Sequence, residues 1–272
     1  MKELRPAAGR GHSPEYGNWV SRRLVSIPAV VGIGFVLLAG LSLVFVIPAA
    51  GFLLVSAYFA YARYLFAPGG GDVQGMIWST LLEHLEWDGR GRALDIGCGS
   101  GALSIGLAKK FPAATVVGVD HWGKQWEYSK SLCERNAAFE GVEERVTFQK
   151  ASASSLPFPD ESFDVVVSNL VFHEVRDAPD KQKLIREALR VVRRGGLFAF
   201  QDLFLIRRMY GDVDALLASI RAWDVAKVEF VETHKAPFVP SALKLPFMVG
   251  IMGLIVGEKQ GRNPPQILTP PS

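Results

Sequence analysis

An uncharged and strongly apolar run over residues 24–62 limits what this chain can fold into more than any other feature. At about 1.5 Å per helical residue, the run would extend for roughly 58 Å, about twice the hydrocarbon thickness of a bilayer. One straight helix would therefore be too long. The run predicts two transmembrane helices, a hairpin over residues 24–66, with its turn between Gly40 and Gly51.

Basic residues stand outside both ends of this predicted hairpin. Five lie in a basic N-terminal segment, residues 1–23: Lys2, Arg5, Arg10, Arg22 and Arg23. Arg63 stands at the other end. Because Lys and Arg accumulate on the cytoplasmic side of membrane spans, we expect a two-pass membrane protein whose remaining chain is cytoplasmic. Trp19 is expected at the membrane interface.

Two alternatives to a membrane hairpin stay open. A cleaved signal peptide fits poorly, because the apolar core is too long and a second apolar stretch follows it. A hairpin buried against a soluble domain is the other, and four small residues would permit close helix packing in either setting: Gly32, Gly34, Ala39 and Gly40. A third apolar run, residues 245–257, is too short to span and predicts a buried strand with its approach.

Composition restricts the partners of the chain. The 272 residues are 49% hydrophobic, enough for the core of one domain of ordinary size with an appendage. The net charge is +3 and Lys and Arg adjoin only in pairs, so nucleic acid is not expected as a partner. Cys98 and Cys133 have no metal-ligand spacing, so no metal centre is expected.

Strand and helix patterns alternate after a breaker cluster at residues 67–72, which predicts a linker over 67–75. The expected strands are 92–96, 115–119, 145–149, 163–168, 197–201, 228–231 and 254–257. The expected helices are 72–86, 102–111, 125–140 and 180–192, the last closed by Gly195 and Gly196. This order predicts an α/β domain with a doubly wound, mostly parallel seven-stranded sheet over 76–259, followed by a flexible tail over 260–272.

The segment LDIGCGSGALSIGLAKK, residues 94–110, carries the most chemical information. A strand delivers Asp95 near its end, and three glycines then form a turn that leads into a helix whose free N–H groups favour a polar or negative ligand. About twenty residues further on, Asp120 ends the next strand, where a carboxylate can accept hydrogen bonds from ribose hydroxyls. Together these features predict a nucleoside pocket at the carboxyl ends of adjacent strands.

This combination resembles the class I S-adenosylmethionine-dependent methyltransferases with a methyltransferase type 11/25-like domain, which have a Rossmann-like fold. The loop is GCGSG preceded by Asp95, whereas dinucleotide sites carry G-x-G-x-x-G. Further agreement comes from Asp120 and from the segments LPFPDESFDVVVSNLVFHEV (156–175), EALRVVRRGGLFAF (187–200) and LIVGEK (254–259). The resemblance covers roughly residues 76–259 and implies S-adenosyl-L-methionine as the cofactor; a nicotinamide or flavin site is the alternative.

The resemblance also implies which residues hold the cofactor. Asp95 and the glycine loop would bind its methionine portion, Asp120 its ribose, and His121 would border the adenine. The family often has an acid where this chain has Ser152, so the serine and the amide of Ala153 would serve the adenine instead. The full expected set is Asp95, Gly97, Cys98, Gly99, Gly101, Asp120, His121, Ser152, Ala153, Asn169 and Leu170.

Methyl transfer requires an acceptor aligned with an activated methyl, so positioning supplies much of the rate and a base is not obligatory. If the acceptor must lose a proton, His173 is the first candidate base, with Glu174 and Asp202 as the second. The alternative for His173 is a helix-start residue that contacts backbone. Asp177 is expected to cap a helix.

We therefore expect a membrane-anchored methyltransferase acting on a lipophilic or small-molecule acceptor. The alternative is a non-catalytic membrane-bound scaffold or sensor that binds the same cofactor. Modification of nucleic acid is disfavoured, because the fourth strand ends in SNLVF and not in an Asn-Pro-Pro-Tyr or Asp-Pro-Pro-Tyr motif. Acceptor loops are expected near residues 203–221 and 233–247.

Overall fold

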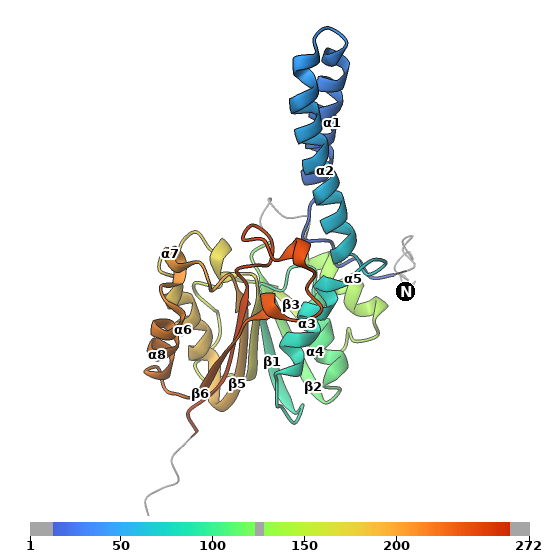
Figure 1. Ribbon diagram of the computed structural model, residues 1–272. Coiled ribbons are helices and arrows are strands. Elements are labelled where there is room, and N and C mark those ends of the chain that lie inside the picture. Colours follow the sequence, from blue (N-terminus) through green and yellow to red (C-terminus); the bar gives the residue numbers. More distant parts are fainter. Residues whose placement is uncertain (1–12, 123–127, 262–272) are drawn as a thin grey trace, which may run out of the picture.

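The computed structural model describes residues 13–122 and 128–261, an α/β domain from which a helical hairpin projects (Figure 1). Lys2, Arg5 and Arg10, on which the predicted orientation partly rests, lie outside the described residues, as does the start of the helix expected over 125–140. The expected flexible tail is described only as far as Gly261.

A seven-stranded sheet forms the centre of the domain, in the order β3-β2-β1-β4-β5-β7-β6. Its strands are β1 (Gly91–Ile96), β2 (Ala114–Asp120), β3 (Val146–Lys150), β4 (Phe163–Asn169), β5 (Val192–Asp202), β6 (Val225–Val231) and β7 (Gly253–Lys259). β7 is antiparallel to both neighbours and the other pairings are parallel, which confirms the predicted mostly parallel sheet. The strand order reverses between β1 and β4, where sheets of this type form a ligand crevice at the carboxyl ends of the strands.

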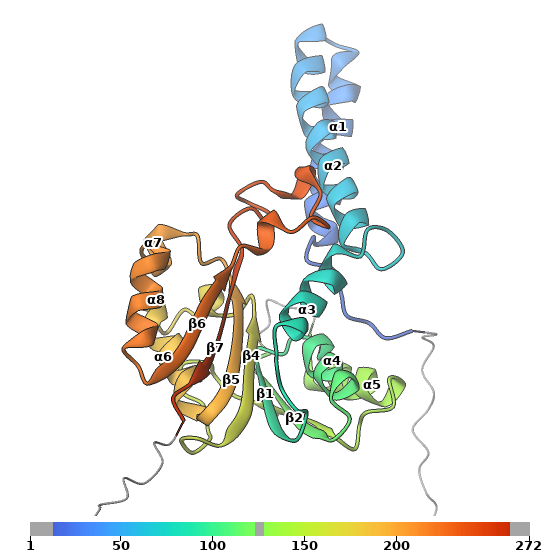
Figure 2. The ribbon, with the colours of Figure 1, turned by 60° about the horizontal axis from the view of Figure 1, so that its bottom comes forward.

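Helices cover both faces of this sheet (Figure 2). One face carries α3 (Val73–Glu83), α4 (Ala102–Lys110) and α5 (Lys130–Phe139), and the other carries α6 (Lys181–Val191), α7 (Arg207–Tyr210) and α8 (Val213–Arg221). Alternate strand residues explain the two layers: Leu94 and Val166 point into the core under α6 and α8, whereas Ala93 and Val165 point into the core under α3 and α4. The central strands are thus buried on both faces, which their near-continuous apolar sequence favours.

Two predicted helix boundaries are wrong. Asp72 precedes α3 but does not cap it, because its φ is +47° and its side chain makes no capping hydrogen bond; the helix then ends at Glu83 and not near residue 86. β5 begins at Val192, directly after α6, so Gly195 and Gly196 lie within a strand and do not close a helix. Gly195 has a φ of +69° next to a register shift in the β4–β5 pairing.

Residues 203–221, expected as an acceptor loop, contain α7 and α8. Asp212 caps α8 by accepting a hydrogen bond from the backbone of Asp214. Tyr210 is almost fully buried, with its ring 4.8 Å from that of Phe204, so it belongs to the core and does not face an acceptor. The apolar spacing of residues 213–221 is a helical signal that the expected loop does not explain.

The hairpin consists of α1 (Arg22–Ala39), a short 3-10 turn η1 (Leu43–Phe45) and α2 (Val46–Phe66), so its turn falls in the predicted interval. Gly32 lies against α2, where an added Cβ would be 2.9 Å from the Leu53 side chain. The Ser56 hydroxyl donates a 2.9 Å hydrogen bond to the Val25 carbonyl, which joins the two helices near their base. Gly34 has open space around it, so it does not contribute to this close packing.

Most of the hairpin extends away from the domain (Figures 1 and 2). Both helices are long and apolar enough to cross a membrane, and few of their side chains are buried. Leu41 and Leu43 at the apex are 84% and 81% exposed. The structure therefore does not have the hairpin buried against a soluble domain, which was one of the two alternatives to a membrane hairpin. The lower part of α2 is fixed to the domain, by Tyr58, whose hydroxyl donates to the Ala242 carbonyl, and by Leu65 and Phe66 in a small core beneath the helix.

Candidate functional site

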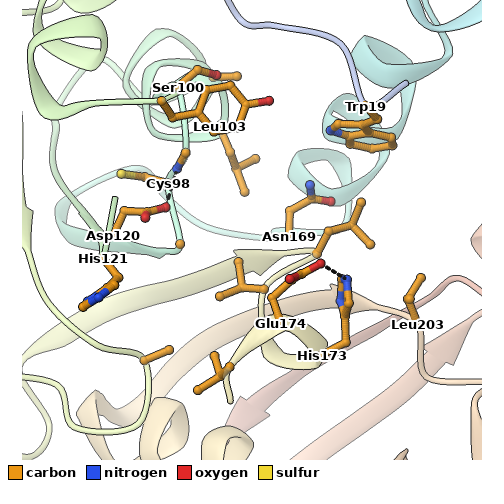
Figure 3. Close-up of a pocket in the computed structure, with 18 of the residues that line it drawn as sticks. Trp19, Cys98, Ser100, Leu103, Asp120, His121, Asn169, His173, Glu174 and Leu203 are labelled. Atoms are coloured by element: carbon orange, nitrogen blue, oxygen red, sulfur yellow. Dashed lines mark hydrogen bonds and ion pairs between the residues drawn. The ribbon is translucent and has the colours of Figure 1, made fainter. Parts of the chain in front are cut away.

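A cavity of about 1110 Å³ opens at the carboxyl ends of β1, β2 and β4, where the strand order reverses (Figure 3). Pockets for one drug-sized ligand usually measure about 300–1,000 Å³, so this cavity has room for more than one molecule. Its lining includes ten of the eleven residues predicted to hold the cofactor. The exception is Gly101, which lies at the start of α4 and faces Phe148 and Cys133.

The glycine loop between β1 and α4 forms one wall of the cavity. Gly97 has a φ of +73°, and a Cβ there would lie 2.1 Å from the Val171 side chain, so no other residue fits. Gly99 has a φ of +53°, and an added Cβ would lie 3.5 Å from the Tyr128 ring, so a side chain there would stand beside the cavity that both residues line. The amides of Gly97 and Cys98 both donate to the Val119 carbonyl, at 2.7 and 3.0 Å, which ties the loop to β2.

Asp95 and Asp120 bring two carboxylates to this wall. Asp95 is buried and accepts a 2.6 Å hydrogen bond from the Ser104 hydroxyl. Burial raises the pKa of Asp95 to about 7, although the hydrogen bond from Ser104 opposes the shift. Asp120 accepts from the amides of Gly99 (2.9 Å) and Trp122 (2.7 Å), so it also braces the glycine loop, a role that the sequence did not predict.

The predicted adenine side contains a chain of hydroxyls in place of the family acid. The Ser152 and Ser154 hydroxyls are 2.8 Å apart, and Ser154 donates a 2.6 Å hydrogen bond to Asp177. Ser152, Ala153 and Asp177 all line the cavity, so a carboxylate is present on this side. The prediction that Asp177 caps a helix is wrong, because Asp180 caps α6.

His173 faces the cavity on the short η2 segment (Phe172–Glu174) after β4 (Figure 3). Its Nδ1 atom is 2.6 Å from Asp202 and its Nε2 atom 3.4 Å from Glu174. Burial lowers the pKa of His173, but the hydrogen bonds to Asp202 and Glu174 outweigh burial and raise it to about 9. The alternative that this side chain contacts only backbone is therefore wrong.

Asp202 lies behind His173 and does not line the cavity, unlike the other two predicted catalytic residues. Its carboxylate has no exposed surface and also accepts hydrogen bonds from the backbone amides of His173 (3.3 Å) and Leu203 (2.6 Å). These contacts fix the orientation of the imidazole. Asp202 can therefore position His173, but it cannot touch a ligand in the cavity.

The sequence did not reveal that residues 13–21, here named the strap, cross the cavity. The backbone amide of Glu15 donates a hydrogen bond to the side-chain oxygen of Asn136, and the side-chain nitrogen of Asn136 donates one to the Glu15 carbonyl, both at 2.9 Å. The amide of Trp19 donates to Gln74 at 3.1 Å, and its ring lies 5.4 Å from that of Phe66. Trp19 thus lines the cavity, a position that the sequence did not predict.

The geometry defines a class of site: an α/β domain with a nucleoside pocket built from a glycine loop and two carboxylates. Residues 94–200 match the family described as methyltransferase domain. The chain is 39% identical over 159 residues to the 27-O-demethylrifamycin SV methyltransferase of Amycolatopsis mediterranei (strain S699), covering 50% of this chain and 56% of that protein. It is 35% identical over 133 residues to methyltransferase GfsG of Streptomyces halstedii, covering 49% and 45%.

The domain is therefore a class I S-adenosylmethionine-dependent methyltransferase domain, and S-adenosylmethionine is its cofactor. This excludes the nicotinamide or flavin alternative. The chain spans about half the length of the curated relatives it matches. A solved structure of the cyclase SpnF shares the fold, with a TM-score of 0.52 and 21% identity over 69% of this chain and 82% of that one. Since one fold supports different reactions, the site has to carry the functional argument.

Proposed function

We propose that this protein is an S-adenosylmethionine-dependent methyltransferase that is held at a membrane by the α1–α2 hairpin. The observation that carries the proposal is a continuous cavity that joins the glycine loop to the base of the hairpin. The residues around the loop fit the cofactor, because a buried carboxylate, the backbone of Gly99 without a side chain and a second carboxylate meet at one wall. The bound cofactor supplies a methyl group already activated on a sulfonium.

In this proposal Asp95 holds the ammonium group of the cofactor and Asp120 holds its ribose while it braces the glycine loop. Ser152, Ala153 and Asp177 border the adenine, with Asp177 replacing the acid that the family often has at the position of Ser152. Asn169 stands between the two ligand positions, where its side-chain oxygen accepts a 3.0 Å bond from Gln201 and is thereby held in place.

His173 is proposed to face the acceptor, with Asp202 as its positioning residue. Because its pKa is about 9, the imidazole is protonated on both nitrogens and positively charged at neutral pH. A protonated His173 donates a hydrogen bond to an acceptor group that is already anionic, and it is a poor base toward one that is not. Glu174 lies beside the same imidazole and balances its charge.

Membrane attachment is supported by the length, apolar surface and projection of the two helices. Arg22 and Arg23 are exposed at the start of α1, on the domain side of the hairpin, in keeping with a cytoplasmic domain. Arg63 donates instead to the Val20 carbonyl and helps to fix the strap. The acceptor is proposed to be a lipophilic or small molecule that reaches the cavity at this surface.

Calorimetric titration of the detergent-solubilised full chain with S-adenosylmethionine and S-adenosylhomocysteine tests the cofactor site. Asp120→Asn should weaken both affinities by at least about tenfold, because a charge-assisted hydrogen bond contributes roughly 1.5–3 kcal/mol. Asp88→Asn is the matched control, since Asp88 also accepts from a backbone amide, that of Arg90, but is exposed and lies outside the cavity. A folded wild-type chain that binds neither compound would overturn the proposal.

A further inference from the structure

The cavity continues well beyond His173, away from the glycine loop. This outer half lies between the strap, the base of the hairpin and the connection between β6 and β7. Its walls are apolar and aromatic and include Trp19, Leu24, Phe59, Phe66, Phe247 and Met248. None of these residues is needed to bind a nucleoside, so the outer half must accommodate something else.

The outer half opens at the base of the hairpin. Leu24 and Phe247 line the cavity and are also 43% and 66% exposed, so the two residues form the edge of an opening, here named the lateral mouth. The β6–β7 connection is fastened beside it: the Tyr58 hydroxyl of α2 donates a 2.9 Å bond to the Ala242 carbonyl, and the Tyr58 and Phe247 rings are 5.9 Å apart. Figure 2 shows this connection against the lower part of α2.

The length of the hairpin places the lateral mouth at the bilayer. From Leu24 to its end, α1 would extend for about 24 Å at 1.5 Å per residue, less than the roughly 30 Å hydrocarbon core. The lower end of α2 is not available to lipid, because Leu65 and Phe66 are buried in the domain. A bilayer that surrounds the hairpin therefore reaches down to Leu24 and Phe247, and the mouth faces hydrocarbon.

We propose that the acceptor is a membrane amphiphile that enters sideways through the lateral mouth. Its hydrocarbon chain lies along the apolar outer half of the cavity, and its polar head, which carries the methyl-accepting atom, reaches His173. This inference rests on the proposed function and adds to it the class of acceptor and its route. Phe247 and Leu24 are then determinants of access, and Trp19 contacts the chain of the acceptor.

Photo-crosslinking of the full chain in vesicles tests this route. The vesicles consist of phosphatidylcholine and phosphatidylglycerol with a small fraction of a fatty acid that carries a diazirine at the end of its chain. After irradiation, peptides are mapped by mass spectrometry. We expect adducts inside the outer half of the cavity, on Trp19 or Met248, in addition to adducts on exposed hairpin residues such as Leu37.

A matched pair of variants in one loop separates the mouth from general lipid contact. Phe247→Glu should lower the cavity adducts by at least fivefold and leave the Leu37 adducts unchanged, because a charge at the mouth opposes passage of a hydrocarbon chain. Leu245→Glu places the same charge two residues away, at a partly exposed residue that does not line the cavity, and should leave both adducts unchanged. Circular dichroism of each variant, measured on the same preparation, reports whether the domain has folded, and its S-adenosylmethionine affinity reports separately whether the cofactor wall is intact.

The outcomes of this experiment are distinct. Adducts confined to the hairpin surface in a wild-type chain that binds S-adenosylmethionine would overturn the lateral route and leave the proposed function standing. Equal loss of cavity adducts in Phe247→Glu and Leu245→Glu would also overturn it. Cavity adducts in a folded chain that does not bind the cofactor would remove the methyltransferase proposal and leave a lipid-binding cavity.

Discussion

Asp95 is a buried carboxylate whose ionisation should control cofactor binding. The folded-state pKa of about 7 lies above the ordinary value of 3.8, so the folded protein holds this proton more tightly than the unfolded chain does. The stabilisation from the neutral carboxyl is thus present at low pH and is lost as the pH rises through about 7. A cofactor ammonium group has the opposite preference, because it pairs with the ionised carboxylate.

Cofactor affinity is therefore expected to depend on pH in a defined direction. Below pH 7 the affinity for S-adenosylmethionine should fall by up to about tenfold per pH unit, and binding should release a proton. Calorimetry between pH 5.5 and 8 in two buffers of different ionisation enthalpy measures both effects. Asp95→Asn should bind more weakly and without this pH dependence; an equally steep dependence in that variant would show that another group titrates.

His173 is expected to act in turnover and not in cofactor binding. His173→Gln should lower kcat by roughly 100-fold, because the acceptor is then no longer held in line with the methyl group, with S-adenosylmethionine affinity unchanged. In the wild type, kcat should fall as the pH rises through about 9, because the imidazole then loses its proton. An increase in kcat through the same pH would show instead that His173 is a base.

At the scale of elements, the effect of the loop between β1 and α4 on cofactor binding can be measured separately from its effect on the stability of the domain. Gly99 and Gly141 both have positive φ, +53° and +69°, and neither has an atom within 3.4 Å of an added Cβ. Gly99→Ala and Gly141→Ala should each destabilise the chain by about 1–2 kcal/mol. Only Gly99→Ala should abolish S-adenosylmethionine binding, since its methyl group occupies the cofactor side of the loop. Thermal-shift assays compare the stabilities of the two variants, and calorimetry compares their S-adenosylmethionine affinities. Equal affinities of the two variants would contradict this placement of Gly99.

Elements with a strong local pattern were predictable from the sequence. The strand that ends near Asp95, the glycine turn and the carboxylate of Asp120 follow one another at short range, so the position of the cofactor wall could be inferred. The helix at 213–221, in a segment expected to be a loop, also has a local signal, the spacing of Leu216, Leu217 and Ile220 behind its cap.

Parts of the site that depend on distant contacts were not predictable. Trp19 reaches the cavity because its backbone bonds to Gln74 and its ring meets Phe66, 47 residues further along, and no local pattern encodes those partners. The pairing of His173 with Asp202 joins residues 29 positions apart. The sequence suggested both residues as candidate bases. In the structure His173 faces the cavity, whereas the buried Asp202 can only position His173.

At the scale of the whole molecule, the hairpin returns the chain to the side from which it started. If the hairpin spans a membrane as proposed, both of its outer ends are on one side of the membrane and the apex is on the other. Ser42→Cys places a thiol at the apex, and Lys227→Cys places one on an exposed strand of the domain, while the native Cys98 and Cys133 are buried.

A membrane-impermeant maleimide applied to intact cells is expected to label Ser42→Cys without permeabilisation. Lys227→Cys should react only after permeabilisation, because the proposed topology places the domain in the cytoplasm. Protection of both thiols in intact cells would show that the hairpin lies in one leaflet and does not span the bilayer.

The proposed function is best tested by methyl transfer from S-adenosylmethionine labelled at its methyl group, in vesicles that contain the full chain and a total membrane lipid extract. We expect label in a chloroform-soluble product, with one S-adenosylhomocysteine formed per methyl transferred. Asp88→Asn should retain this activity, and Asp120→Asn should lose most of it. Binding of the cofactor without formation of S-adenosylhomocysteine would show a scaffold or sensor and contradict the proposed methyltransferase. Label found only in water-soluble products would contradict a lipophilic acceptor.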